Sequence, residues 1–176
     1  MPRRTCLAGG VVSLLLSSCS WPFTAQDLSV EVVSYGRYEA EYAGHFKRTP
    51  RVYRSPDPTL IEETDEIPCR KGERFGVAYR IVERGGNSAR FSIDVVWEHP
   101  LLHEQLDQVH GTQTEYSMPV RLRDGSTPIR FSGWGFNQES DLAEGRWTLT
   151  LLYGSHTLLR KSFDVWGCGA DPSVWQ

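Results

Sequence analysis

The sequence has little of what nucleic-acid-binding and membrane-spanning proteins need. Its 19 lysines and arginines are outnumbered by 22 acidic residues, which gives a formal net charge of -3. A protein that binds a phosphate backbone needs a basic surface, so this balance argues against a nucleic-acid partner. The apolar run from Leu7 to Leu16 has about ten residues, whereas a membrane-spanning helix needs roughly 20. The chain has 176 residues, of which 39% are hydrophobic and 23% are charged. This is the size and composition of one folded domain.

Sequence motifs of common catalytic and cofactor sites are also missing. The chain has no Gly-x-Ser-x-Gly motif for a hydrolase serine and no glycine-rich loop that could hold a nucleotide phosphate at the start of a helix. We therefore expect no cofactor, and the sequence favours a binding protein over an enzyme.

The first 18 residues have the pattern of an export signal. Arg3 and Arg4 precede the apolar run, and small residues lead to Cys19. The stretch from Leu16 to Cys19 resembles the lipobox of bacterial lipoproteins, in which the cysteine is acylated and becomes the mature N-terminus. We therefore predict a signal peptide over residues 1–18, a membrane anchor on Cys19 and a tether over residues 19–27. Ordinary secretion with cleavage nearby is the alternative.

Ser20, which follows Cys19, and the number of cysteines both indicate in which cellular compartment the protein lies. Ser20 is not acidic, which in a lipoprotein of a Gram-negative host indicates the outer membrane, facing the periplasm. Cys6 would leave with the signal and Cys19 would carry lipid, so Cys69 and Cys168 remain. In an oxidising compartment such a pair favours a disulfide that closes a loop of about 100 residues, and half of a metal site is the alternative.

Alternation of apolar and polar residues predicts an all-β domain over residues 28–168, followed by a tail over residues 169–176. The expected strands cover about residues 28–42, 73–84, 90–97, 116–122, 129–131, 147–153 and 157–166. No apolar stripe of helical period runs for ten or more residues, and turn signals recur about every ten residues. This pattern favours an immunoglobulin-like, two-sheet antiparallel sandwich of about seven strands. If strands alternate in direction, Cys69 and Cys168 lie at the same end of it.

Several short motifs follow one another along the mature chain. They are Tyr35-Gly36-x-Tyr38, Ile67-Pro68, Gly72, Phe75-Gly76, Trp97-x-His99-Pro100, Leu142-x-x-Gly145-x-Trp147 and Phe163-x-Val165. In this order and spacing they resemble a bacterial family of small exported proteins known only as a domain of unknown function. The resemblance implies an immunoglobulin-like sandwich and no activity, because the family has no assigned catalytic or binding residues. It does not extend to the cysteine pair or to the proline-bearing segment 43–68.

The best candidate for catalysis is a group of histidines after the third strand. His99 and His103 are four residues apart and His110 lies close by, so a short helix could aim two imidazoles at one metal ion. Their order is not that of the His-Glu-x-x-His motif, and a polar loop with several histidines is often only solvated. These histidines define the alternative function, a metal-assisted hydrolase of the cell envelope.

Two further groups are candidates for binding. Trp134 and Phe136 flank Gly135 and could form an exposed aromatic platform for a sugar ring or a partner protein, or equally a buried corner of the core. Basic residues interleaved with an aromatic lie in the proline-bearing segment, at Lys47, Arg48, Arg51, Tyr53 and Arg54. They could contact anionic lipid or polysaccharide, or form a loop that nearby acids neutralise.

Taken together, these patterns predict a lipid-anchored binding or adaptor module of the cell envelope. Its partner would be a protein or an envelope polymer. The segments 43–68 and 99–114 are the expected contact surfaces, because binding residues concentrate on loops held by a rigid scaffold.

Overall fold

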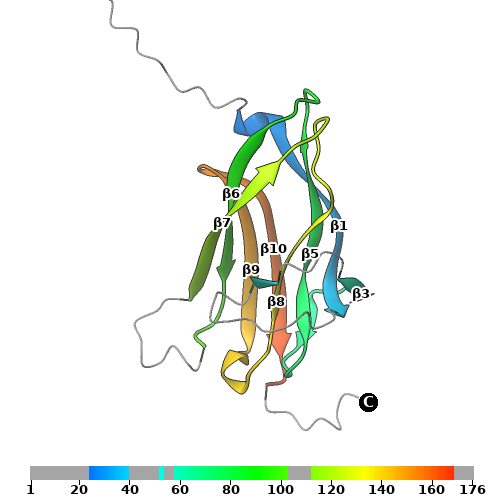
Figure 1. Ribbon diagram of the computed structural model, residues 1–176. Coiled ribbons are helices and arrows are strands. Elements are labelled where there is room, and N and C mark those ends of the chain that lie inside the picture. The colour runs from blue at the N-terminus through cyan, green and yellow to red at the C-terminus, as the bar shows by residue number, and fades with distance from the viewer. Residues whose placement is uncertain (1–23, 40–51, 54–57, 103–111, 169–176) are drawn as a thin grey trace, which may run out of the picture.

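The computed structural model describes residues 24–39, 52–53, 58–102 and 112–168, which form the strands of a β-sandwich (Figure 1). The strands are β1 (Leu28–Glu39), β2 (Val52–Tyr53), β3 (Thr59–Glu62), β4 (Glu66–Pro68), β5 (Arg74–Glu83), β6 (Arg90–Glu98), β7 (Gln113–Arg121), β8 (Arg130–Gly135), β9 (Gly145–Tyr153) and β10 (His156–Trp166). Two single turns of 3-10 helix, η1 (Ala25–Asp27) and η3 (Glu139–Asp141), accompany them. No helix in these ranges is long and apolar enough to cross a bilayer.

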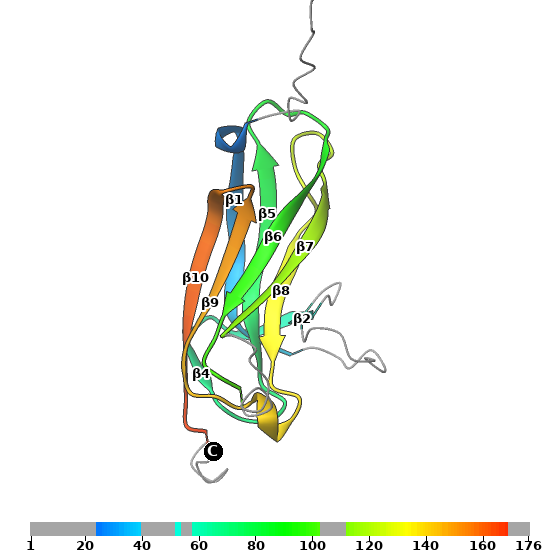
Figure 2. The ribbon, with the colours of Figure 1, turned by 90° about the vertical axis from the view of Figure 1, so that its left-hand side faces the viewer.

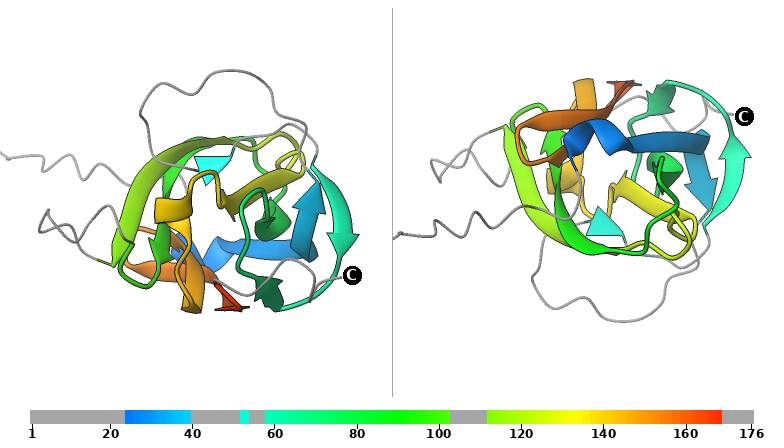
Figure 3. Two further views of the ribbon diagram at one scale, coloured as in Figure 1. Left: turned by 90° about the horizontal axis from the view of Figure 1, so that it is seen from below. Right: turned by 90° about the horizontal axis from the view of Figure 1, so that it is seen from above.

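The strands form two sheets of five, which face each other when the molecule is seen end-on (Figure 3). One sheet has the order β2-β8-β5-β1-β3 and the other the order β4-β10-β9-β6-β7. Every pairing is antiparallel except that of β10 with β4. The predicted fold class, an immunoglobulin-like sandwich, is therefore confirmed.

The predicted number of strands is too low. The seven long strands are those that the alternation predicts, and the three short ones, β2 to β4, come from the segment 43–68, which we expected to be a surface excursion. Parts of this segment instead extend the sheets: β2 pairs with β8, β3 with β1 and β4 with β10. Strands of two to four residues are too short to show a periodic pattern.

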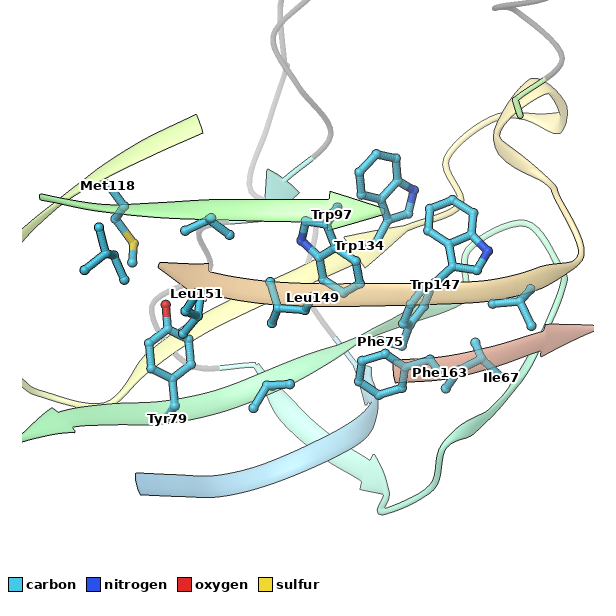
Figure 4. Close-up of a cluster of buried hydrophobic side chains, with 14 of the residues drawn as sticks. Ile67, Phe75, Tyr79, Trp97, Met118, Trp134, Trp147, Leu149, Leu151 and Phe163 are labelled. Atoms are coloured by element: carbon cyan, nitrogen blue, oxygen red, sulfur yellow. The ribbon is translucent and has the colours of Figure 1, made fainter. Parts of the chain in front are cut away.

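Large apolar side chains from the long strands share one core. Phe75, Trp97, Leu149 and Phe163 are fully buried, and Phe91 packs against the same cluster. The ring of Phe75 lies at the centre, with its centroid 5.8 Å from that of Trp97 and 5.2 Å from that of Phe163 (Figure 4). Each such side chain contributes about 1.5–3 kcal/mol when buried, so this layer holds the two sheets together.

Strand β1 departs from the predicted alternation. By alternation Val32 shares the face of Val30, which packs on the core, yet 46% of Val32 is exposed. A register shift in the pairing with β5, typical of a β-bulge, follows directly between Val32 and Ser34. Gly36 has a φ of +126°, and a Cβ there would overlap the carbonyl oxygen of Glu62, so only glycine fits.

The two ends of the sandwich are distinct (Figure 2). The N-terminal end carries η1, the turn after β5, the segment between β7 and β8, and the β9–β10 hairpin. The distal end carries the ends of β1 and β6, the start of β9 and the disulfide. The structure joins Cys69 to Cys168 there, 99 residues apart in sequence and with 4.7 Å between their Cα atoms, as the strand directions predict.

The fold begins before the predicted domain boundary. Residues 25–27, the last of the expected tether, form η1. The backbone N–H of Arg84 donates a hydrogen bond to the carbonyl oxygen of Asp27, at 3.0 Å, which fixes η1 to the turn after β5. The Asp27 carboxylate accepts hydrogen bonds from the backbone and hydroxyl of Thr24, and these hydrogen bonds lower the pKa of Asp27.

Candidate functional site

Many residues of the predicted site lie outside the described residues. These are Cys19, Lys47, Arg48, Arg51, Arg54, His103 and His110. Tyr53 lies in β2, where its backbone pairs with Gly133 of β8. The roles assigned to this group from the sequence therefore stay predictions.

His99 is part of the core, and the structure contradicts its assignment as a metal ligand. The residue is 4% exposed. Its Nδ1 atom donates to the carbonyl oxygen of Pro100 at 2.9 Å, and its Nε2 atom is 3.1 Å from Thr114 Oγ1. Both ring nitrogens thus have a partner, whereas a metal ligand needs a nitrogen lone pair that is available. Among the residues that the structure describes, no three potential ligands converge on a metal site.

Trp134 and Phe136 are also buried, so they form no exposed aromatic platform. Trp134 is 2% exposed and Phe136 is fully buried. Their rings pack on Trp147, with centroids 5.1 Å and 5.6 Å from its centroid. Figure 4 shows Trp134 beside Trp147. Trp147, predicted to be structural, is itself fully buried and donates its indole N–H to the carbonyl oxygen of Ala143 at 3.2 Å. Of the two alternatives for this pair, the buried corner is correct.

A hollow of about 380 Å³ opens at the distal end, between the end of β1 and the turn before β5. We name it the distal hollow. Its lining residues are Arg37, Tyr38, Glu39, Ile61, Arg70, Lys71, Gly72, Glu73 and Arg74. Four of these are basic and two are acidic, so basic residues are in excess in the lining.

A buried carboxylate holds two of these arginines in place. The side chain of Glu73 is 4% exposed and accepts from Arg37 Nε at 2.9 Å and from Arg70 Nε at 2.9 Å. Arg37 also donates through Nη1 to Glu62 at 2.7 Å. The hydrogen bond to Glu73 is the main reason that the pKa of Arg37 is raised. These contacts make one wall of the distal hollow rigid, while Lys71 is exposed beside it.

A second hollow, of about 450 Å³, lies at the N-terminal end. We name it the N-terminal hollow, and its lining residues are Ser88, Ala89, Arg90, Arg121, Leu122 and Arg123.

Sequence reasoning missed both hollows. Their basic residues are scattered along the chain, and only the pairing of β6 with β7 brings Arg90 opposite Arg121.

Comparison with known proteins supports the fold and assigns no activity. No curated protein matches the sequence. An immunoglobulin-like protein from Pseudomonas aeruginosa has a crystal structure that is similar to this one, with a TM-score of 0.56 and 22% sequence identity. The match covers 81% of this chain and 100% of the other, and at this identity it shows the fold alone.

A weaker structural match is to a β-glucosidase from Listeria innocua, solved in complex with gluconolactone. Its TM-score is 0.45 at 10% identity, over 80% of this chain and 16% of the other, and it carries no argument about function. The family comparison is more extensive, because residues 26–165 match the family described as Domain of unknown function (DUF3859). That match spans most of the chain and includes all the long strands, so the protein belongs to the DUF3859 family.

Proposed function

We propose that the protein is a lipid-anchored module of the bacterial cell envelope that binds a partner at its distal end. One observation carries the proposal: both expected contact segments leave the sandwich from that end. Strand β1 ends and β3 begins there, and so do the end of β6 and the start of β7. The fold begins with η1 at the opposite end (Figure 1).

The proposed lipid anchor and the expected contact segments are at opposite ends of the sandwich, so both can act at once. Cys19 lies five residues before Thr24, and five extended residues reach at most roughly 18 Å. An acylated Cys19 would therefore hold the N-terminal end close to the bilayer and leave the distal end accessible. The disulfide at the distal end supports export, because disulfides persist in oxidising compartments.

The distal hollow indicates the chemistry of the partner. Lys71 is exposed in the lining, and its ammonium group is suited to carboxylates or phosphates. The partner we propose is an acidic patch on a protein or an acidic polymer of the envelope. The mechanism is electrostatic and shape complementarity on a rigid scaffold, without covalent chemistry.

Site-specific photocrosslinking in intact cells tests this proposal. Ile61 lines the distal hollow and is 55% exposed, whereas Ile129, which precedes β8, is 50% exposed on another part of the sandwich. A photoreactive phenylalanine at position 61 should yield a defined crosslinked species, and the same group at position 129 should not. The variant Lys71→Glu should lower the yield from position 61. Equal crosslinking from both positions, or a yield that does not respond to Lys71→Glu, would contradict the proposal.

A further inference from the structure

Two arginines of the N-terminal hollow lie side by side, and this arrangement does not help the chain to fold. Arg90 and Arg121 are directly opposite each other in the antiparallel pairing of β6 and β7. Opposite residues of such a pair project from the same face, and Phe91 and Val120, their inward neighbours, belong to the core side. Two like charges are therefore adjacent on the outer face, which destabilises the pairing.

No acid among the described residues forms an ion pair with these arginines. The lining holds three arginines, Arg90, Arg121 and Arg123, and no carboxylate. Other arginines of the structure form ion pairs with acids, for example Arg146 with Asp164 at 3.0 Å. In the described part of the chain, the side chains of the three arginines of the hollow have no such partner. Their donors are thus available to an anion from outside.

The hollow is held open by backbone contacts and contains a further donor. The N–H of Leu122 donates to the carbonyl oxygen of Ala89 at 2.9 Å, which ties its two sides together. The hydroxyl oxygen of Ser88 accepts from the N–H of Asp124 at 3.3 Å. Since the oxygen is the acceptor in that bond, the hydroxyl hydrogen of Ser88 can be donated to an anion.

The position of the hollow indicates which anion is within reach. The turn that leads to Ser88 is joined to η1 by the hydrogen bond between Arg84 and Asp27, and the turn after Arg123 is joined to β5, because Glu83 N–H donates to the carbonyl oxygen of Gly125 at 2.7 Å. The start of β6 and the end of β7, which line the hollow, thus lie at the end of the sandwich where the fold begins (Figure 2). A membrane that holds the chain at Cys19 would face it.

We propose that the N-terminal hollow binds the phosphate of anionic phospholipid headgroups and so orients the sandwich upright on the bilayer. The upright orientation rests on the proposed lipid anchor, whereas headgroup binding does not. Each basic residue near an anionic surface favours binding, and three arginines together change partitioning on the order of a hundredfold.

Vesicle binding by the chain from residue 19 with Cys19→Ser tests the proposal without the anchor. The described core begins at Ala25, so this chain retains it. Vesicles of phosphatidylcholine with about one-third phosphatidylglycerol should bind it, and the variant Arg90→Gln/Arg121→Gln/Arg123→Gln should bind on the order of a hundredfold less. The control Arg80→Gln/Arg146→Gln/Arg160→Gln removes the same charge from residues outside both hollows and should bind nearly as well as the parent chain. Thermal melting should show that the arginine variant is folded and no less stable.

Two results would overturn the proposal. An equal loss in both triple variants would mean that net charge alone drives binding. Binding of inorganic phosphate at the hollow, without preference for anionic over neutral vesicles, would make it a site for free phosphate. Acylation of Cys19 is measured separately, so failure of the anchor and failure of headgroup binding are distinguishable.

Discussion

His99 stacks on Trp147, with their ring centroids 5.2 Å apart and their planes 29° from parallel. Its ring also lies 5.2 Å from that of Trp134, so the imidazole is one layer of the aromatic core. From that position it hydrogen-bonds two polar groups, the carbonyl oxygen of Pro100 and the hydroxyl of Thr114. This histidine is a structural residue.

Replacing this histidine should therefore weaken the fold. We expect His99→Ala to lower the free energy of unfolding by about 2–4 kcal/mol, since it removes a buried ring and leaves polar groups without partners. Urea denaturation measures the change, and the exposed His156→Ala is the control, with a loss of at most about 0.5 kcal/mol. A zinc-dependent stabilisation that disappears in His99→Ala would show instead that His99 is a ligand.

The wall of the distal hollow depends on one carboxylate. We expect Glu73→Gln to lower the free energy of unfolding by about 2–3 kcal/mol, because Arg37 and Arg70 both lose a buried acceptor. Glu62→Gln removes an exposed partner of Arg37 and should cost less than about 1 kcal/mol. Equal losses for the two variants in guanidinium denaturation would show that burial of Glu73 is unimportant.

The disulfide should contribute strongly to stability. It closes a loop of 99 residues, for which the chain-entropy estimate is about 4–5 kcal/mol as an upper value. We expect the variant Cys69→Ala/Cys168→Ala to unfold at lower denaturant concentration, and a reductant to shift the midpoint of the parent chain but not of this variant. A parent midpoint that a reductant leaves unchanged would speak against a bridge between these cysteines.

Alkaline pH should destabilise the sandwich through Tyr79. Burial raises the pKa of this fully buried phenol from 10.0 to about 12, with a hydrogen bond to Ser132 acting in the opposite direction. Above about pH 10 the unfolded chain loses this proton before the folded protein does, so stability that is complete below pH 10 is lost as the pH approaches 12.

The variant Tyr79→Phe lacks that titration. The loss of unfolding free energy between pH 9 and pH 12 should be smaller in Tyr79→Phe than in the parent chain by about 2–3 kcal/mol, the equivalent of the shift of the Tyr79 pKa. Denaturation at several pH values measures it. Parallel pH profiles for the two proteins would mean that the pKa of Tyr79 is the same in the folded and the unfolded state.

The fold was predictable from sequence wherever strands are long and buried on one face. In β5 and β6 each inward position carries a large apolar residue, such as Phe75 or Trp97, so a period of two is evident. In β1 the extra residue at the bulge shifts the register, and Val32 is exposed although the pattern places it inside. Counting cysteines was sufficient to predict the disulfide, because Cys6 and Cys19 were assigned to the predicted signal and lipid site.

The candidate sites were less predictable because they depend on contacts between distant parts of the chain. Trp134 and Phe136 have the same local sequence whether they are exposed or buried, and only the packing of Trp147 on them decides. The opposition of Arg90 and Arg121 becomes visible only when the register of β6 and β7 is known. A sequence pattern records periodicity along one strand and does not record register between two.

Mass spectrometry of the protein isolated from its host membranes tests the central claim most directly. The account predicts an N-terminal peptide that begins at Cys19 and carries acyl chains, in a protein that fractionates with the membrane, and a Cys19→Ala variant that loses both properties. An unacylated protein that is released from cells by osmotic shock, with a mature N-terminus other than Cys19, would contradict the account.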